Sequence, residues 1–105
     1  MAQFAVYKNK NPTTRNTYPF LVDIQSNLLD DLRTTVVIPL SPLSAIGGEP
    51  ISRLCPIVEI QDKKYVVLTQ QLAGVDRKIL GPKIADLTKY RSDLIAAIDF
   101  VISGI

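Results

Sequence analysis

The stretch PIVEIQDKKYVVLT, residues 56–69, decides the fold class of this chain. Two apolar runs rich in β-branched residues flank the polar tetrad Gln61-Asp62-Lys63-Lys64. This pattern is typical of two antiparallel strands joined by a turn. We therefore predict a β-hairpin here and expect the chain to be mainly β.

The residues that precede the hairpin extend the strand pattern. Residues 3–8 and 18–24 alternate between apolar and polar, which predicts two half-buried strands paired across the polar loop 8–17. Residues 25–33 predict a bend or a short helical turn, and residues 35–40 a further strand. In that strand Pro39 favours a strand end, a bulge or an edge, because proline has no N–H to donate. Residues 41–50, with two prolines and two glycines, predict a loop.

The residues that follow the hairpin end in a helical pattern. Residues 70–81 show no clean period, and a helix is predicted from residues 86–88 onward, with Thr88 as its N-cap. Its apolar stripe contains Tyr90, Leu94, Ala97, Ile98, Val101, Ile102 and Ile105. Four or five short strands and one helix predict a small antiparallel β-barrel with the helix against one side.

Composition sets limits on what the chain can do. Its 105 residues fit one domain, residues 1–105, and the absence of histidine excludes imidazole catalysis and histidine-ligated metals within one chain. The single cysteine, Cys55, excludes an intramolecular disulfide, and we expect a buried, inert thiol. A net charge of +2 is too small for the protein as a whole to bind nucleic acid by electrostatic attraction. No apolar run reaches membrane-spanning length, so we expect a cytoplasmic protein without a cofactor.

Three local features allow more than one interpretation. The adjacent Asp30 and Asp31 fit a solvated bend better than a catalytic pair. Five basic residues between Arg77 and Arg91 fit either a modest basic patch or a solvated helix start. At the C-terminus, Gly104 fits a helix C-cap that presents Ile105 to a partner, although Ile105 also fits the core stripe.

Seven blocks carry a resemblance to a known family. They are QFAVY (residues 3–7), LVDIQSNLLD (21–30), VVIPL (36–40), CPIVEI (55–60), LTQQLAGV (68–75), IADLT (84–88) and the terminal Gly104-Ile105. In this order and spacing the chain resembles the CcdB toxins of bacterial CcdA-CcdB toxin–antitoxin modules over nearly its full length. The resemblance implies an SH3-like β-barrel with a C-terminal helix, acting as a symmetric homodimer.

The resemblance also implies a function without chemistry of its own. Toxins of this family bind the A subunit of DNA gyrase and trap the complex in which gyrase is covalently attached to cleaved DNA. The matching positions here imply gyrase contacts at Gln3, Phe4, Ser26, Leu28, Leu29, Asp99, Ile102, Ser103, Gly104 and Ile105. Ser103 stands where the best-known form of the family has tryptophan, and losing such an anchor costs ~2 to 4 kcal/mol, a roughly 30- to 1000-fold weaker complex.

The second implied partner is an antitoxin. Its disordered tail would fold along the toxin dimer, neutralise it, and help the complex bind operator DNA. We expect Lys8, Lys10, Arg15 and Asp23 to face this tail, together with the loop 41–50.

Two other functions compete with gyrase poisoning. MazF-like toxins resemble CcdB in fold but cleave RNA, which needs a base and phosphate-binding cations in one cleft. The basic residues near Arg77 to Arg91 supply cations, but no motif of that family is present. The other alternative is a CcdB relative that binds antitoxin without poisoning gyrase, for which Ser103 is the only indication.

Overall fold

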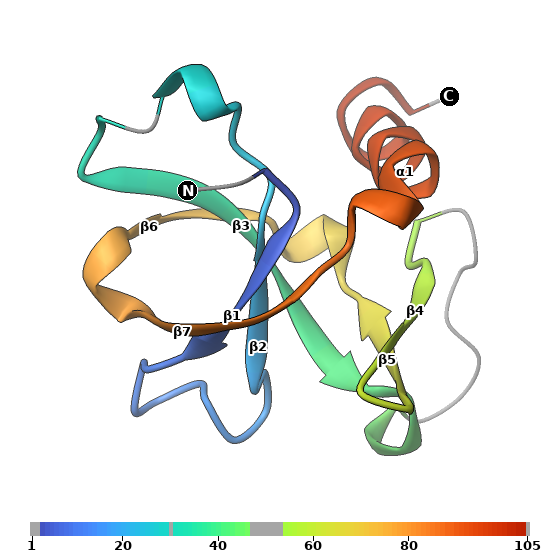
Figure 1. Cartoon of the computed structure of the whole chain (residues 1–105). Coiled ribbons are helices and arrows are strands. Elements are labelled where there is room, and N and C mark those ends of the chain that lie inside the picture. The colour runs from blue at the N-terminus through green and yellow to red at the C-terminus, as the bar shows by residue number, and fades with distance from the viewer. Residues whose placement is uncertain (1–2, 30, 47–53, 105) are drawn as a thin grey trace.

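The fold is a single antiparallel sheet that curls into a half-barrel, with one helix against it (Figure 1). The structure is a computed structural model that describes residues 3–29, 31–46 and 54–104. Within them, the strands follow the order β4-β5-β3-β2-β1-β7, and β6 pairs with β3 off this path. The bounds are β1 Ala5–Asn9, β2 Phe20–Asp23, β3 Thr34–Pro42, β4 Ile57–Ile60, β5 Lys63–Val67, β6 Ala73–Asp76, β7 Leu80–Asp86 and α1 Arg91–Ser103. The predicted fold class is confirmed, although the described residues form seven strands instead of four or five.

The hairpin of β4 and β5 confirms the prediction from residues 56–69. Ile60 pairs with Lys63, so the turn consists of Gln61 and Asp62 alone. Their φ angles, 52° and 67°, are those of a type I′ turn, whose twist matches that of the paired strands. Lys63 and Lys64 belong to β5.

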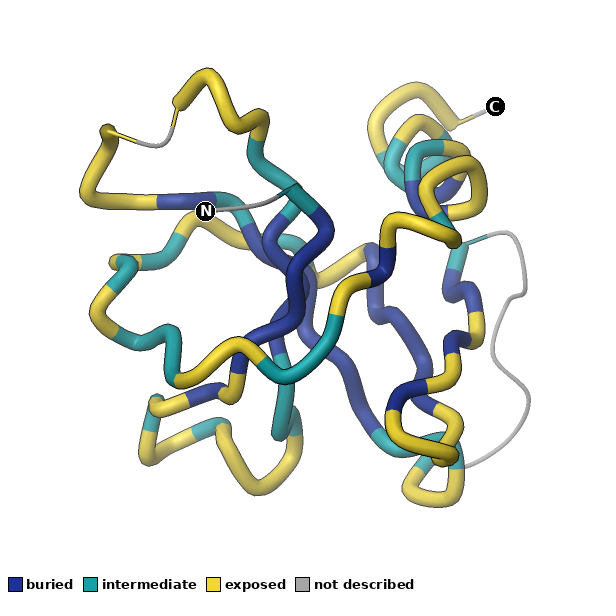
Figure 2. The backbone as a smooth tube through the Cα atoms, in the orientation of Figure 1, coloured by how far each residue is buried: buried dark blue, intermediate teal, exposed yellow. Residues whose placement is uncertain are grey.

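The pairing of β1 with β2 is also as predicted, but the expected half-buried pattern is wrong. Val6 lies opposite Val22 in the antiparallel ladder. Every residue from Phe4 to Tyr7 is buried (Figure 2), and β1 lies between β2 and β7 in the sheet. The ladder starts at Ala5, since Phe4 has a φ of 71°.

Pro39 lies inside β3, where the prediction expected an end, a bulge or an edge. Along one side, β3 pairs with β2, and Leu21 lies opposite Pro39. Along the other side, β3 pairs first with β6 as far as Val37 and then with β5 from Leu40. The Pro39 carbonyl accepts the Leu68 N–H at 3.0 Å. In an antiparallel strand the N–H and the carbonyl of one residue point to the same side, so the N–H that proline lacks would lie where β3 changes its partner from β6 to β5. An interior strand therefore tolerates proline at this one place.

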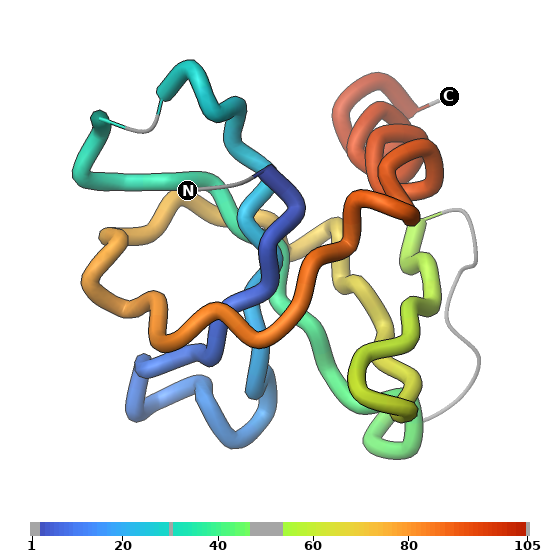
Figure 3. Tube along the Cα trace, in the orientation of Figure 1, coloured from blue at the N-terminus to red at the C-terminus, as the bar shows by residue number. Residues whose placement is uncertain are grey.

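The last two strands were not predicted. After β6, the short 3-10 helix η4 (Arg77–Ile79) leads into β7, which runs antiparallel to β1 (Figure 3). The register shifts within this pairing, between Val6 and Asn9. There Gly81 packs so tightly that a Cβ atom would lie 3.0 Å from the Lys8 carbonyl oxygen.

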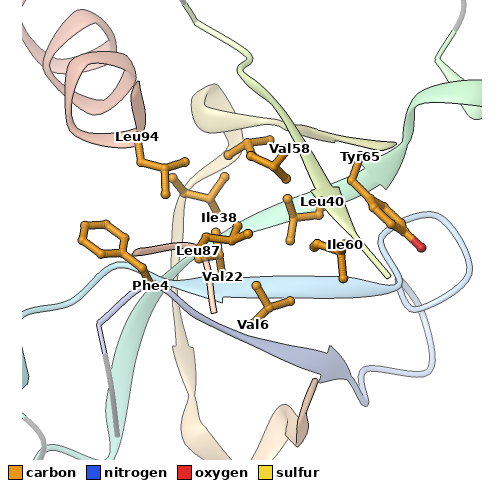
Figure 4. Close-up of a cluster of buried hydrophobic side chains, with 11 residues drawn as sticks. Phe4, Val6, Val22, Ile38, Leu40, Val58, Ile60, Tyr65, Leu87 and Leu94 are labelled. Atoms are coloured by element: carbon orange, nitrogen blue, oxygen red, sulfur yellow. The ribbon is translucent and has the colours of Figure 1, made fainter. Parts of the chain in front are cut away.

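The core lies between the curled sheet and one face of α1. Eleven buried side chains form it: Phe4, Val6, Val22, Ile38, Leu40, Val58, Ile60, Tyr65, Val67, Leu87 and Leu94 (Figure 4). The helix contributes Leu94 and the buried Ala97. Its stripe ends earlier than predicted, because Ile102 is 75% exposed. No helix among the described residues is long and apolar enough to cross a membrane.

The predicted N-cap role of Thr88 is wrong. The 3-10 turn η5 (Thr88–Tyr90) precedes α1, so the α-helix itself begins three residues later. At its start the Asp86 carboxylate accepts the Thr88 backbone N–H at 2.8 Å and also the Thr88 hydroxyl. The aspartate two residues earlier therefore caps the helical segment.

Candidate protein-binding surfaces

Three leucines project from the bend between β2 and β3. Leu28 is 93% exposed, Leu29 46% and Leu32 48%. The bend contains the 3-10 helix η1 (Asn27–Leu29), which confirms the predicted short helical turn. Scattered exposed leucines are ordinary, but three within five residues form an apolar patch of the kind that marks contact sites. We call Leu28, Leu29 and Leu32 the leucine bend.

Gln3 joins the leucine bend to the first strand. Its backbone N–H donates to Asn27 Oδ1 at 2.7 Å, and its side-chain amide donates to the Ile24 carbonyl at 3.1 Å. The Ser26 hydroxyl accepts from the Leu28 N–H at 3.2 Å. The structure thus brings Gln3, Ser26, Leu28 and Leu29, all predicted as gyrase contacts, into one region.

Phe4 stands apart from the other predicted contacts because its side chain is buried. Its N–H donates to the Asp23 carbonyl at 2.6 Å, and its carbonyl accepts from Leu87 at 2.8 Å. The Arg91 guanidinium lies over its ring, 5.7 Å from the centroid. Phe4 therefore joins β1, β2 and the start of the helix, and its side chain is not part of the exposed surface.

The end of α1 forms a second surface, separate from the leucine bend within one chain (Figure 1). Gly104 adopts the left-handed conformation at φ 74°, and its N–H donates to the Phe100 carbonyl at 2.9 Å. The Ser103 hydroxyl donates to the Asp99 carbonyl at 2.6 Å. Asp99, Ile102, Ser103 and Gly104 are all exposed, whereas Ile105 lies outside the described residues. The expected glycine C-cap is confirmed at Gly104.

The basic loop between β1 and β2 is organised by a buried asparagine that sequence reasoning missed. Asn9 Nδ2 donates to Thr14 Oγ1 at 3.0 Å and to the Tyr18 carbonyl at 2.9 Å. Lys8, Lys10 and Arg15 are exposed around it. A hollow of about 200 Å³ opens beside this loop, lined in part by Asn11, Thr14, Val37 and Val75. The only signal in the sequence was the asparagine-rich composition of the loop.

Asp23 is buried, so the predicted antitoxin contact cannot form through its side chain in this conformation. Its Oδ1 accepts from the Thr35 hydroxyl at 2.8 Å and from the Gln25 N–H at 3.1 Å. Its Oδ2 lies 3.8 Å from Arg77 Nη1. Arg77 therefore points inward and does not belong to the basic patch that its sequence neighbours suggested.

Among the described residues, two ionisable side chains have pKa values displaced from their ordinary values, those of Cys55 and Asp86. Burial raises the pKa of the Cys55 thiol, which donates to Gln70 Oε1 at 3.3 Å, so the expected buried thiol is confirmed. Hydrogen bonds from Thr88 lower the pKa of Asp86. No group of three cysteine or acidic side chains that could hold a metal exists in the described part of the chain.

Two solved structures illustrate the similarity of fold. The structure superposes on the Mycobacterium tuberculosis toxin MazF-mt6 with a TM-score of 0.72 and 14% identity, over 93% of this chain and 95% of that one. An endoribonuclease in complex with its cognate antitoxin, from mycobacterial species, gives 0.76 and 11% identity over 97% and 94% of the two chains. At these identities the similarity establishes the fold alone.

Family membership comes from the sequence match. The family model of the CcdB protein matches residues 3–104, nearly the whole chain. The match spans both candidate surfaces, from Gln3 beside the leucine bend to Gly104 at the end of α1. The chain therefore belongs to the CcdB family of toxins from toxin–antitoxin modules.

Proposed function

We propose that the protein poisons DNA gyrase: it binds the A subunit and traps the complex in which gyrase is covalently joined to cleaved DNA. The observation that carries the proposal is the exposed end of α1, where Ile102 projects into solvent and a left-handed Gly104 ends the helix. An exposed apolar side chain beside a helix end suits insertion into a partner's pocket. Membership of the CcdB family supports the same partner.

Poisoning of this kind needs no catalytic group. A ligand that binds one state of the gyrase cycle more tightly than the others raises the population of that state by its differential affinity. The absence of histidine from the sequence is compatible with such a mechanism. We therefore propose a non-enzymatic toxin that works as a symmetric homodimer in the bacterial cytoplasm.

The contacts with gyrase are proposed at the two exposed surfaces. The first comprises Asp99, Ile102, Ser103 and Gly104, which Ile105 follows in the sequence, and the second comprises Gln3, Ser26, Leu28 and Leu29. Since the two surfaces are separate within one chain, we propose that a second protomer brings them to one face. Ser103 provides no aromatic anchor, so the leucine bend carries a larger share of the affinity.

The antitoxin is proposed to bind elsewhere, at the basic loop. Lys8, Lys10 and Arg15 are exposed there and would attract an acidic, disordered tail. Such a tail would neutralise the toxin, and the complex would repress its own operon by binding operator DNA.

A gyrase cleavage assay tests the proposal. Purified protein is incubated with gyrase, supercoiled plasmid and ATP, then quenched with denaturant and protease, and linear DNA is measured. We expect linear DNA with the full chain but not with a variant that lacks Gly104 and Ile105. Ile57→Ala is the matched control, because Ile57 is an apolar residue on β4 with 45% exposure.

The same assay separates the alternatives. Without linear DNA at saturating protein, the poison assignment fails for that gyrase, and a relative that binds antitoxin without poisoning takes its place. Cleavage of a mixed-sequence RNA by the purified protein would instead support an endoribonuclease of the MazF type.

A further inference from the structure

Arg77 forms hydrogen bonds to the segment that carries the leucine bend. It lies in η4, between β6 and β7, and its Nε donates to the Leu32 carbonyl at 2.6 Å. Its Nη2 donates to the Leu29 carbonyl at 3.2 Å, and its backbone N–H donates to the Arg33 carbonyl at 2.9 Å. One residue thus holds three carbonyl oxygens of a segment more than 40 positions earlier in the chain.

The acidic partner of Arg77 is itself fixed. Thr35 and the Gln25 N–H occupy Asp23 Oδ1, which leaves Oδ2 to face Arg77 Nη1 at 3.8 Å. The Arg77 side chain is only 18% exposed and that of Asp23 3%. Water therefore screens this pair less than an exposed ion pair, and the guanidinium is held between a fixed carboxylate and the bend.

The bend benefits from such support because its leucines do not belong to the hydrophobic core clusters. Leu28 is almost fully exposed and Leu29 and Leu32 are about half exposed, so burial only partly determines where they lie. A contact loop that is already ordered avoids the entropy cost of ordering on binding. The planar fork of arginine serves several carbonyl acceptors in fixed directions, whereas a lysine ammonium is a single point charge on a flexible stem.

We infer that Arg77 is a positioning residue: through the Leu29 and Leu32 carbonyls it holds the leucine bend as a preorganised apolar surface for a protein partner. That the partner is gyrase rests on the proposed function, whereas the ordering of the bend does not.

Amide hydrogen exchange, followed by NMR, tests the ordering directly. In Arg77→Ala we expect the Leu29 and Leu32 amides to exchange about tenfold faster, which corresponds to the loss of hydrogen bonds to a charged group. Arg77→Lys should give an intermediate rate, because it keeps the charge beside Asp23 but loses the fork. Lys78→Ala, which removes the exposed neighbouring charge, should leave both rates unchanged. Amides of β4 and β5 should not change in any variant.

A double-mutant cycle tests whether the ordering matters for binding. We expect Arg77→Ala to weaken binding to the gyrase A subunit about tenfold. We expect Leu28→Ala to weaken binding in the wild-type background but to have little effect in the Arg77→Ala background. If Leu28→Ala has the same effect in both backgrounds, Arg77 does not act through the bend and the inference is wrong. If Arg77→Ala does not fold, Arg77→Lys takes its place in the cycle.

The two proposals fail in different ways. Unchanged exchange at Leu29 and Leu32 in both Arg77 variants would overturn the positioning role, whatever gyrase does. No DNA cleavage by the wild-type chain, together with faster exchange in the variants, would overturn gyrase as the partner and support the positioning role.

Discussion

The Tyr90 hydroxyl accepts the backbone N–H of Glu59 at 3.0 Å, which joins the start of the helical segment to the edge strand β4. We expect Tyr90→Phe to lower the free energy of unfolding by about 1 kcal/mol, because the Glu59 N–H loses its acceptor. Urea denaturation measures the change. Tyr18→Phe is the control, since the Tyr18 hydroxyl has no hydrogen bond to any described residue, and equal losses in both variants would contradict the prediction.

Gly81 is expected to tolerate no side chain. An alanine Cβ would approach the Lys8 carbonyl oxygen to 3.0 Å and push β7 away from β1. We expect Gly81→Ala to reduce the free energy of unfolding by about 1 to 3 kcal/mol. In Gly74→Ala the added methyl meets nothing within 4 Å, so thermal denaturation should show little change.

Leu94 and Ile102 lie in the same helix, but we expect Leu94→Ala to reduce stability and Ile102→Ala to reduce the effect on gyrase. Leu94→Ala removes a fully buried core side chain and should cost about 2 to 5 kcal/mol of stability. Ile102→Ala should cost less than about 0.5 kcal/mol, yet it should sharply reduce the linear DNA formed with gyrase. A destabilised Ile102→Ala protein would place this side chain in the core instead of at a contact surface.

Cys55 should react slowly in the folded protein. Burial raises the pKa of its thiol above the ordinary 9.0, so less of the reactive thiolate is present near pH 8. We expect alkylation by iodoacetamide to be much slower than in urea. The pKa of the Cys55 thiol is higher in the folded than in the unfolded protein. The neutral, buried thiol therefore contributes fully to stability below pH 9, and this contribution declines as the pH rises further. Equal alkylation rates with and without urea would contradict this.

Asp86 should titrate below its ordinary value because Thr88 donates two hydrogen bonds to it. Thr88→Val keeps the backbone donor but removes the hydroxyl, so we expect the Asp86 pKa to move up toward 3.8. NMR titration of the carboxyl carbon measures the shift. The stabilising effect is present above pH 3.8 and is lost as the pH falls through the lower, folded pKa. An unchanged pKa in Thr88→Val would leave the hydroxyl without a role.

What the sequence could predict depended on local signals. The hairpin of β4 and β5 was recognisable because its turn and both strands lie within one short stretch. β6 and β7 were not predicted, because neither strand alternates between buried and exposed residues and because they contain Gly74, Gly81 and Pro82. The sequence indicated Arg77 only as another surface cation. Its partners are backbone carbonyls more than 40 positions away, and because every residue has a carbonyl, the sequence does not show which ones Arg77 binds. The exposure of Ile102 could not be predicted, because apolar residues at helical spacing fit a surface that contacts a partner as well as one that packs into the core.

The pairing of β1 with β7 has a consequence for how the protein is made. Residue 5 pairs with residue 86, so the sheet joins two segments that are far apart in the sequence. Until β7 has left the ribosome, β1 presents an unpaired edge, and α1, which completes the core, follows later still. The sheet is therefore completed only after β7 has been synthesised, long after β1 itself.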